Sequence, residues 1–309
     1  MQIFAGEEID MDLFDRTAGP DKDARSRNVA ANPFAAAKFF RFVITAVLET
    51  LFNIDASGQQ VQSDMGVLGE VEAYFGVVEA QGRGTLHLHM LVWLRHAPTS
   101  EEMHDLLQDE KFRLKVTEYI RANIRAHLEG FTKEGIKSMP QEKELAYSRP
   151  PDPTSEDYEH QSIVRERETV RAQQVHTCTK RTCLIFDTQK AKWVCKWRAP
   201  FPLLEEDTVR CDGTCGPKRT YGYLNNSNPA VTECLCCNND AKLLTNGRET
   251  KDSAWYMTGY QTKKTAENSQ CLGTACNRRR IPSQSDYRNR RYPRTEPASS
   301  LLLLPVTES

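Results

Sequence analysis

His87 and His89 are the residues whose type and spacing most directly suggest chemistry. Alternate side chains of a β-strand share a face, so a strand through this stretch would present both imidazoles together and turn Leu88 and Met90 into the core. Two imidazoles and one oxygen ligand leave open positions on a divalent ion, as a catalytic metal requires. A histidine pair on a solvated strand face is the competing interpretation, and the spacing alone does not separate the two.

Glu79 and Gln81 are the candidate oxygen ligands. Residues 74–94 predict two strands joined by a glycine-rich turn at Gly82-Arg83-Gly84. Glu79 and Gln81 share a face of the first strand, and the hairpin can fold them back towards the histidines of the second strand.

A second set of candidate ligands lies in a cysteine-rich segment and consists of His176, Cys178, Cys183 and Cys195. One histidine and three thiols within 20 residues would complete a tetrahedral zinc site. The intervening lengths of one, four and eleven residues do not match a common zinc finger. Free buried cysteines near a loop are therefore the alternative.

Tyr256 and Tyr260 form the third candidate group. A helix capped near Asp252 or Ser253 would place the two tyrosines one turn apart on one face, with Lys263 a further turn along. A tyrosine hydroxyl beside a lysine can attack a phosphodiester, because the cation stabilises both the phenolate and the phosphate. The alternative is an aromatic pair packed against the core.

Composition limits the classes of protein that the chain can belong to. Its 309 residues suffice for a large core, and 39% hydrophobic with 27% charged residues fits a soluble protein. The formal net charge of -1 gives no overall basic signature, so any nucleic-acid surface must be a local patch. We find no membrane span and no secretory signal, and we expect the ten cysteines to be reduced thiols that could bind metal.

The elements that must position these groups follow from hydrophobic spacing. Residues 34–53 predict a helix that packs on the histidine strand, and a capping box at Thr99-Ser100-Glu101-Glu102 predicts another helical region. The predicted division of the chain is a first part with the histidine strand (1–137), a linker and solvated helix (138–174), a cysteine-rich insert (175–237), a strand and tyrosine helix that complete the first part (238–265) and a disordered tail (266–309).

In chain order, the histidine strand, the cysteine-rich segment and the tyrosine helix resemble the replication-initiator (Rep) nuclease domain of Helitron rolling-circle transposons, a branch of the HUH endonucleases. The likeness spans roughly residues 3–265. The matching segments are Glu79-Ala-Gln-Gly-Arg-Gly-Thr-Leu-His-Leu-His-Met-Leu-Val-Trp-Leu94, His176-Thr-Cys178 through Arg198-Ala-Pro-Phe-Pro202, Asn238-Asn-Asp240, and Trp255-Tyr256 to Lys263.

The resemblance implies an α+β, ferredoxin-like HUH nuclease fold whose central antiparallel sheet presents the histidines, with the cysteine-rich insert added. It implies that His87 and His89 hold Mg²⁺ or Mn²⁺, with Glu79 as the third ligand and Gln81 as the runner-up. The metal would polarise the scissile phosphate of single-stranded DNA at the transposon ends.

By the same resemblance, Tyr256 or Tyr260 would attack phosphorus to form a 5′-phosphotyrosine, and the other tyrosine would serve the reverse strand transfer. Lys263 would neutralise phosphate charge. No nucleotide cofactor is needed, since the phosphotyrosine bond conserves the energy of the broken phosphodiester. The likeness further implies a nuclear location and makes base stacking on Trp255 or Trp197 plausible.

The sequence departs from the full transposases of this family in two respects. Those proteins carry a helicase after the nuclease, whereas no Gly-x-x-x-x-Gly-Lys-Ser/Thr phosphate loop occurs here. The likeness also begins at what resembles the middle of the nuclease, without an early strand that family members have. We therefore expect a truncated member that lacks the helicase and this strand. The alternative function is a catalytically inactive remnant that acts at most as a DNA- or zinc-binding domain.

Overall fold

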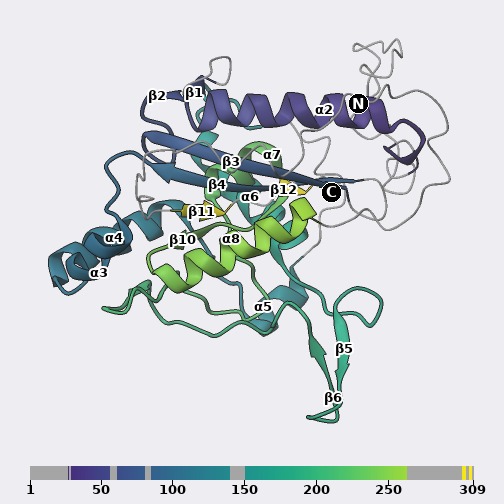
Figure 1. The fold of residues 1–309 in the computed structure, drawn as a ribbon. Coiled ribbons are helices and arrows are strands. Elements are labelled where there is room, and N and C mark those ends of the chain that lie inside the picture. Colours follow the sequence, from purple (N-terminus) through teal and green to yellow (C-terminus); the bar gives the residue numbers. More distant parts are fainter. Residues whose placement is uncertain are drawn as a thin grey trace, which may run out of the picture.

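The hairpin of β3 and β4 lies at the centre of the computed structural model, which describes residues 27, 29–55, 61–80, 85–139, 150–262, 301–303 and 306–307 (Figure 1). The helices are α2 (Pro33–Ala46), η2 (Val47–Leu51), α3 (Ser100–Leu106), α4 (Glu110–Asn123), α5 (Lys133–Ser138), α6 (Tyr158–Thr169), η4 (Val170–Gln174), α7 (Pro229–Leu235) and α8 (Gly247–Thr262). The strands are β1 (Ile54–Asp55), β2 (Gln62–Ser63), β3 (Val71–Ala80), β4 (Leu86–Leu94), β5 (Leu184–Asp187), β6 (Lys192–Cys195), β7 (Thr208–Val209), β8 (Cys215–Gly216), β9 (Asn238–Asn239), β10 (Lys242–Leu244), β11 (Leu301–Leu303) and β12 (Val306–Thr307).

The main sheet is built on β4. Strand β3 pairs with it on one side, and β11 and β12 pair with different parts of its other side. Strands β10 and β9 continue the sheet outwards from β11 and β12, and every pairing is antiparallel. Helices and antiparallel sheets thus make an α+β protein, as the sequence predicted, while the ferredoxin-like arrangement stays a prediction.

Both faces of β4 are covered by helices. On one face, Leu88, Met90 and Val92 belong to a core that includes Phe40 of α2 and Ile120 of α4. This is the face that the alternation of the sequence assigned to the core. Because both faces are buried, the second half of the strand, Met90–Leu94, is a continuous apolar run, and only its first half alternates apolar residues with the two histidines.

Helix α8 covers the opposite face, the one that carries the histidines (Figure 1). Met257 of α8 is 1% exposed and packs with Leu91 of β4 and Leu244 of β10. Trp93 and Val77 complete this small cluster. The cluster holds α8 against the face of the hairpin from which the site residues project.

The helix of the tyrosines begins earlier than the sequence predicted. We expected a cap near Asp252 or Ser253, but α8 begins at Gly247. The Asn246 side chain is the reason, since its Oδ1 accepts a hydrogen bond of 2.8 Å from the Glu249 backbone N–H and so satisfies a free amide of the first turn.

Two stretches of the segment 266–309, for which we expected disorder, are strands. Leu301–Leu303 pairs with β10 and β4, and Val306–Thr307 pairs with β4 and β9. Backbone pairing explains the difference, because the side of β4 away from β3 offers amide and carbonyl groups that an extended apolar segment can satisfy. The other residues of 263–309 lie outside the described residues, and the predicted division of the chain is otherwise untested.

Among the described helices, none is both long and apolar enough to cross a membrane.

Candidate functional site

Glu79, His87 and His89 lie together on the α8-facing side of the β3–β4 hairpin. Glu79 pairs with His87 in the strand register, and its Oε2 lies 3.3 Å from Nε2 of His89. The two imidazole rings meet edge to face with centroids 4.4 Å apart. The predicted hairpin therefore brings the carboxylate and both histidines to one spot.

Burial keeps His87 neutral. His87 is 9% exposed, and the loss of hydration, with a smaller effect of His89, lowers its pKa to about 4 despite the opposing charge of Glu79. A neutral imidazole has a lone pair for a metal ion. Among the described residues, the Nδ1 of His87 is one of the few buried polar side-chain atoms without a hydrogen-bond partner. An orphaned imidazole nitrogen beside a carboxylate fits a bound cation.

Tyr256 approaches this group from α8. Its ring lies edge to face with that of His89, with centroids 5.5 Å apart, and about half of its side chain is exposed. The neighbouring Met257 is buried in the cluster beneath the helix, so Tyr256 is held at the edge of the site. A half-exposed tyrosine adjacent to candidate metal ligands can meet a large substrate from outside.

The other sequence-predicted members of this site are described less fully. Tyr260 lies one turn further along α8, and its side chain is outside the described residues. Gln81 and Lys263 are also outside the described residues. Their roles stay predictions.

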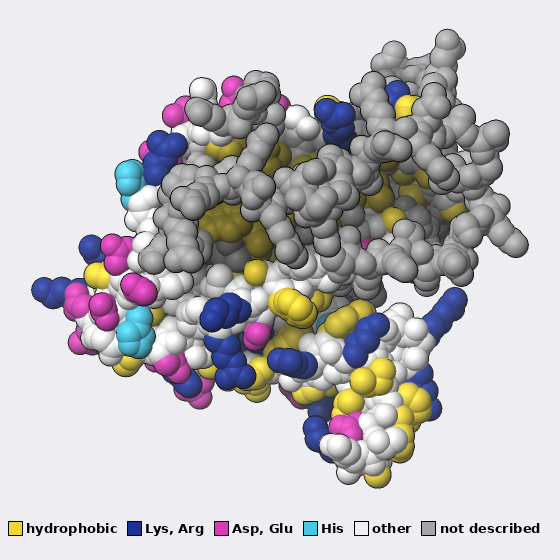
Figure 2. All heavy atoms as spheres, in the orientation of Figure 1, with side chains coloured by type: hydrophobic (Ala, Val, Ile, Leu, Met, Phe, Trp, Pro, Cys, Tyr) yellow, Lys and Arg dark blue, Asp and Glu magenta, His cyan; other side chains and the backbone are white. Residues whose placement is uncertain are grey.

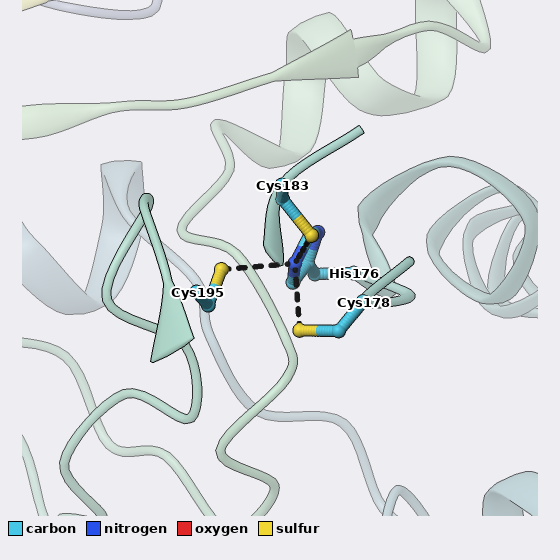
Figure 3. Close-up of side chains that lie close together, drawn as sticks. All are labelled: His176, Cys178, Cys183 and Cys195. Atoms are coloured by element: carbon cyan, nitrogen blue, oxygen red, sulfur yellow. Dashed lines mark hydrogen bonds between the residues drawn. The ribbon is translucent and has the colours of Figure 1, made fainter. Parts of the chain in front are cut away.

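His176, Cys178, Cys183 and Cys195 form the second group (Figure 3). Their ligand atoms all lie within 4.8 Å of one another. The Sγ atoms of Cys178, Cys183 and Cys195 lie 3.2, 3.5 and 3.4 Å, respectively, from Nε2 of His176. A tetrahedral zinc ion with ordinary Zn–N and Zn–S bonds separates these atoms by about 3.5 Å. The predicted convergence of one imidazole and three thiols is thus present.

Hydrogen bonding alone does not explain this convergence. One imidazole nitrogen has one lone pair, so it can accept a good hydrogen bond from only one of the three thiols. Burial, with the hydrogen bonds and charges of Cys183 and Cys195, raises the pKa of Cys178 to about 12. Crowded thiolates therefore disfavour one another, and a divalent cation removes that cost by pairing with all of them.

Backbone contacts from several elements hold the four ligands. The N–H of His176, just after η4, donates to the Tyr223 carbonyl at 2.7 Å. Cys195 is the last residue of β6 and pairs with Leu184 of the neighbouring strand β5. The N–H of Lys196 donates to the Cys183 carbonyl at 2.8 Å. The hairpin of β5 and β6 therefore closes the eleven-residue gap that made the sequence spacing unusual.

Within the described part of the chain, this is the one group of three or more histidine, cysteine or acidic residues whose ligand atoms converge closely enough for a metal ion. Glu79, His87 and His89 do not meet that condition as they stand. A cysteine and histidine cluster that could hold a metal such as zinc is thus present, whereas the Mg²⁺ or Mn²⁺ site stays a proposal.

Sequence reasoning missed two kinds of residue. Met257 positions Tyr256 but reads in sequence as an ordinary apolar helix residue. Phe186 and Trp193 are about half exposed on the β5–β6 hairpin, and the sequence held a signal for them, since the stretch between Cys183 and Cys195 carries these two aromatic residues together with Lys190 and Lys192.

Comparison with known protein families finds a match in the N-terminal part of the chain. Residues 6–92 match the family model described as the Helitron helicase-like domain at N-terminus, a range that contains α2, β3 and most of β4 with Glu79, His87 and His89. No curated protein and no solved structure matches the chain.

Proposed function

We propose that this chain is a metal-dependent, single-stranded DNA endonuclease and strand transferase of a rolling-circle transposon, and the match of residues 6–92 to the Helitron helicase-like domain supports this proposal. The ferredoxin-like HUH arrangement, a nuclear location and the transposon ends as substrate belong to the same proposal.

One observation carries the proposal. Tyr256 of α8 stacks edge to face on His89, which with His87 and Glu79 lies on the facing side of the hairpin. A nucleophile and a set of candidate metal ligands, more than 150 residues apart in the chain, are thereby neighbours. An aromatic pair packed in a core, the alternative for the tyrosines, does not account for the exposed ring of Tyr256.

The residues fit a divalent metal in their chemistry. His87 and His89 offer imidazole nitrogens and Glu79 offers a carboxylate, with Gln81 as the runner-up ligand. When bound, Mg²⁺ or Mn²⁺ supplies Lewis acidity that polarises the scissile phosphate.

In the proposed reaction, the hydroxyl oxygen of Tyr256 or Tyr260 attacks phosphorus and forms a 5′-phosphotyrosine bond to the 5′ end of the downstream fragment. The bond between phosphorus and the 3′ oxygen breaks, and that oxygen leaves with a proton as a 3′-hydroxyl. Lys263 neutralises phosphate charge, and the second tyrosine serves the return transfer. One ester bond replaces another, so no ATP is consumed.

The test is covalent capture of DNA. Single-stranded oligonucleotides from transposon ends, incubated with the full chain and Mn²⁺, should yield a protein–DNA adduct that survives denaturing electrophoresis. Tyr256→Phe combined with Tyr260→Phe should abolish it, and so should His89→Ala. Tyr158→Phe is the matched control, because Tyr158 is also exposed but lies on α6. A correctly folded wild-type chain that forms no adduct would overturn the proposal.

A second function is favoured by the converging cysteine and histidine ligands. A chain that has lost nuclease activity could still bind zinc and DNA, because the zinc ligands lie apart from the tyrosines in the sequence. Bound zinc and measurable DNA affinity without adduct formation would favour this inactive remnant.

A further inference from the structure

The β5–β6 hairpin projects from the body of the protein (Figure 1). Its register pairs Phe186 with Trp193 and Ile185 with Val194. Phe186 and Trp193 are 52% and 47% exposed, and their rings meet edge to face with centroids 5.6 Å apart. Exposed aromatic rings that gather on one protrusion indicate a binding surface more strongly than scattered ones.

Trp197 extends this aromatic surface to the base of the hairpin. It is 52% exposed, and its ring lies edge to face with that of His176, with centroids 5.1 Å apart. Cys183 and Cys195, at the two ends of the hairpin, belong with His176 to the candidate zinc site. The metal ligands therefore hold the base of the hairpin and the position of Trp197 together.

Positive charge surrounds these rings. The Nζ of Lys180 lies 4.8 Å from the centroid of Trp193, and the Nζ of Lys196 lies 5.0 Å from that of Trp197. Figure 2 shows hydrophobic and basic side chains side by side over this protrusion, at the lower right. Between residues 180 and 198 the basic residues are Lys180, Arg181, Lys190, Lys192, Lys196 and Arg198.

The charge of this segment is unlike that of the whole chain. The only acidic residue between 180 and 198 is Asp187, and its carboxylate lies 3.6 Å from the Nζ of Lys190. The full chain has a net charge of -1, so the hairpin is a local basic patch of the kind that a nucleic-acid ligand requires.

We infer that the β5–β6 hairpin with Trp197, held at its base by the metal ligands, is a stacking platform for single-stranded DNA. Unpaired bases stack on Trp193, Phe186 and Trp197, and the lysines contact the phosphates between them. Duplex DNA keeps the faces of its bases inside the helix and so does not fit exposed rings. The inference rests on the proposed function for the choice of DNA as the ligand, but it needs neither the tyrosines nor DNA cleavage.

The test measures equilibrium binding in a chain that cannot cleave. In the Tyr256→Phe/Tyr260→Phe background without added Mn²⁺, fluorescence anisotropy follows binding of a labelled oligothymidylate. Trp193→Ala and Trp197→Ala should each weaken binding about ten-fold, and DNA should quench the tryptophan fluorescence of the parent chain. Trp197→Phe should retain most of the affinity, since a phenyl ring still stacks.

Two controls keep the result specific. Phe34→Ala removes another exposed ring with a lysine above it, Lys38 at 4.6 Å, but lies on α2 and should leave binding unchanged. Zinc content and the thermal melting curve should stay unchanged in Trp193→Ala, whose ring is not the one that contacts His176. Loss of affinity in this variant therefore cannot be assigned to loss of metal.

Unchanged affinity in the Trp193→Ala/Trp197→Ala double variant would overturn the inference, and so would equal affinity for a duplex of the same sequence. The outcome is separate from that of the nuclease test. If the wild-type chain forms no adduct and the tryptophan variants lose affinity for oligothymidylate, the nuclease proposal is refuted and the stacking platform is supported.

Discussion

The carboxylate of Glu79 lies 3.3 Å from Nε2 of His89, although its partner in the strand register is His87. Such a diagonal contact is reached in an antiparallel pair because the strands twist and because a glutamate side chain is long enough to cross to the next residue of the same face. The carboxylate therefore stands next to both imidazoles, one directly opposite and one diagonal.

This contact predicts the effect of Glu79→Gln. The amide keeps the shape of the side chain but removes the charge that would help hold a cation, so we expect about ten-fold weaker Mn²⁺ binding and lower adduct yield at limiting Mn²⁺. Calorimetric titration with Mn²⁺ and adduct yield against Mn²⁺ concentration measure the two effects. Glu72→Gln is the control, since Glu72 lies on the same strand but is exposed. Equal Mn²⁺ affinity in Glu79→Gln and the wild type would remove Glu79 from the ligand set.

Met257→Ala tests how α8 is positioned. Met257 is 1% exposed among Leu91 and Leu244, so truncation should lower the free energy of unfolding by about 2–5 kcal/mol. Adduct formation should fall as well, because Tyr256 loses its support. Denaturant unfolding and hydrogen exchange in α8 report the change. Lys251→Ala, at an exposed position of the same helix, should alter neither stability nor adduct formation.

Removal of zinc should unfold or loosen the segment from His176 to Arg198. We expect about one zinc ion per chain, lost on treatment with a strong chelator and on acidification, because protonated thiols do not bind metal. Cys183→Ser and Cys195→Ser should lower zinc content and make this segment sensitive to protease. Metal analysis and limited proteolysis measure both changes.

The control for zinc binding is Cys211→Ser, because Cys211 is exposed and is not a member of the converging group. A chain that purifies without zinc and does not take it up at neutral pH would contradict the assignment of the cysteine and histidine cluster.

Gly213→Ala should destabilise the loop against which α8 begins. Gly213 has a φ of +78°, and an added Cβ would lie 2.7 Å from the Thr245 carbonyl oxygen. The Gly213 carbonyl also accepts hydrogen bonds from the side chains of Thr245 and Asn246. We expect the free energy of unfolding to fall by about 1–3 kcal/mol or more. Gly69→Ala separates backbone strain from steric overlap, because Gly69 has a φ of +101° but nothing within 4 Å of an added Cβ. Its loss of unfolding free energy should therefore be smaller than that of Gly213→Ala.

Gly259→Ala should raise the stability of the protein, in contrast to Gly213→Ala. Gly259 is exposed within α8, and nothing lies within 4 Å of an added Cβ. Alanine favours the helix by about 1 kcal/mol over glycine, so the melting temperature should rise. A lower melting temperature would show that this turn of α8 makes a contact that glycine alone permits.

Local periodicity made part of the site readable from sequence. The two-residue repeat of a strand was enough to put His87 and His89 on one face and Leu88 and Met90 on the other, and the structure confirms both. The residue types at 176, 178, 183 and 195 were enough to propose a zinc site, since imidazole and thiolate are the ligands that zinc prefers.

Contacts between distant segments decided the rest. Tyr256 reaches His89 only because Met257 is buried against Leu91 and Leu244, and no spacing within α8 encodes that packing. The start of α8 depended on the Asn246 cap, and the closure of the eleven-residue gap between Cys183 and Cys195 depended on β5–β6 pairing. Sequence alone determined which side chains could act together. The tertiary structure decided which ones meet, because packing and strand pairing act between residues that are far apart in the chain.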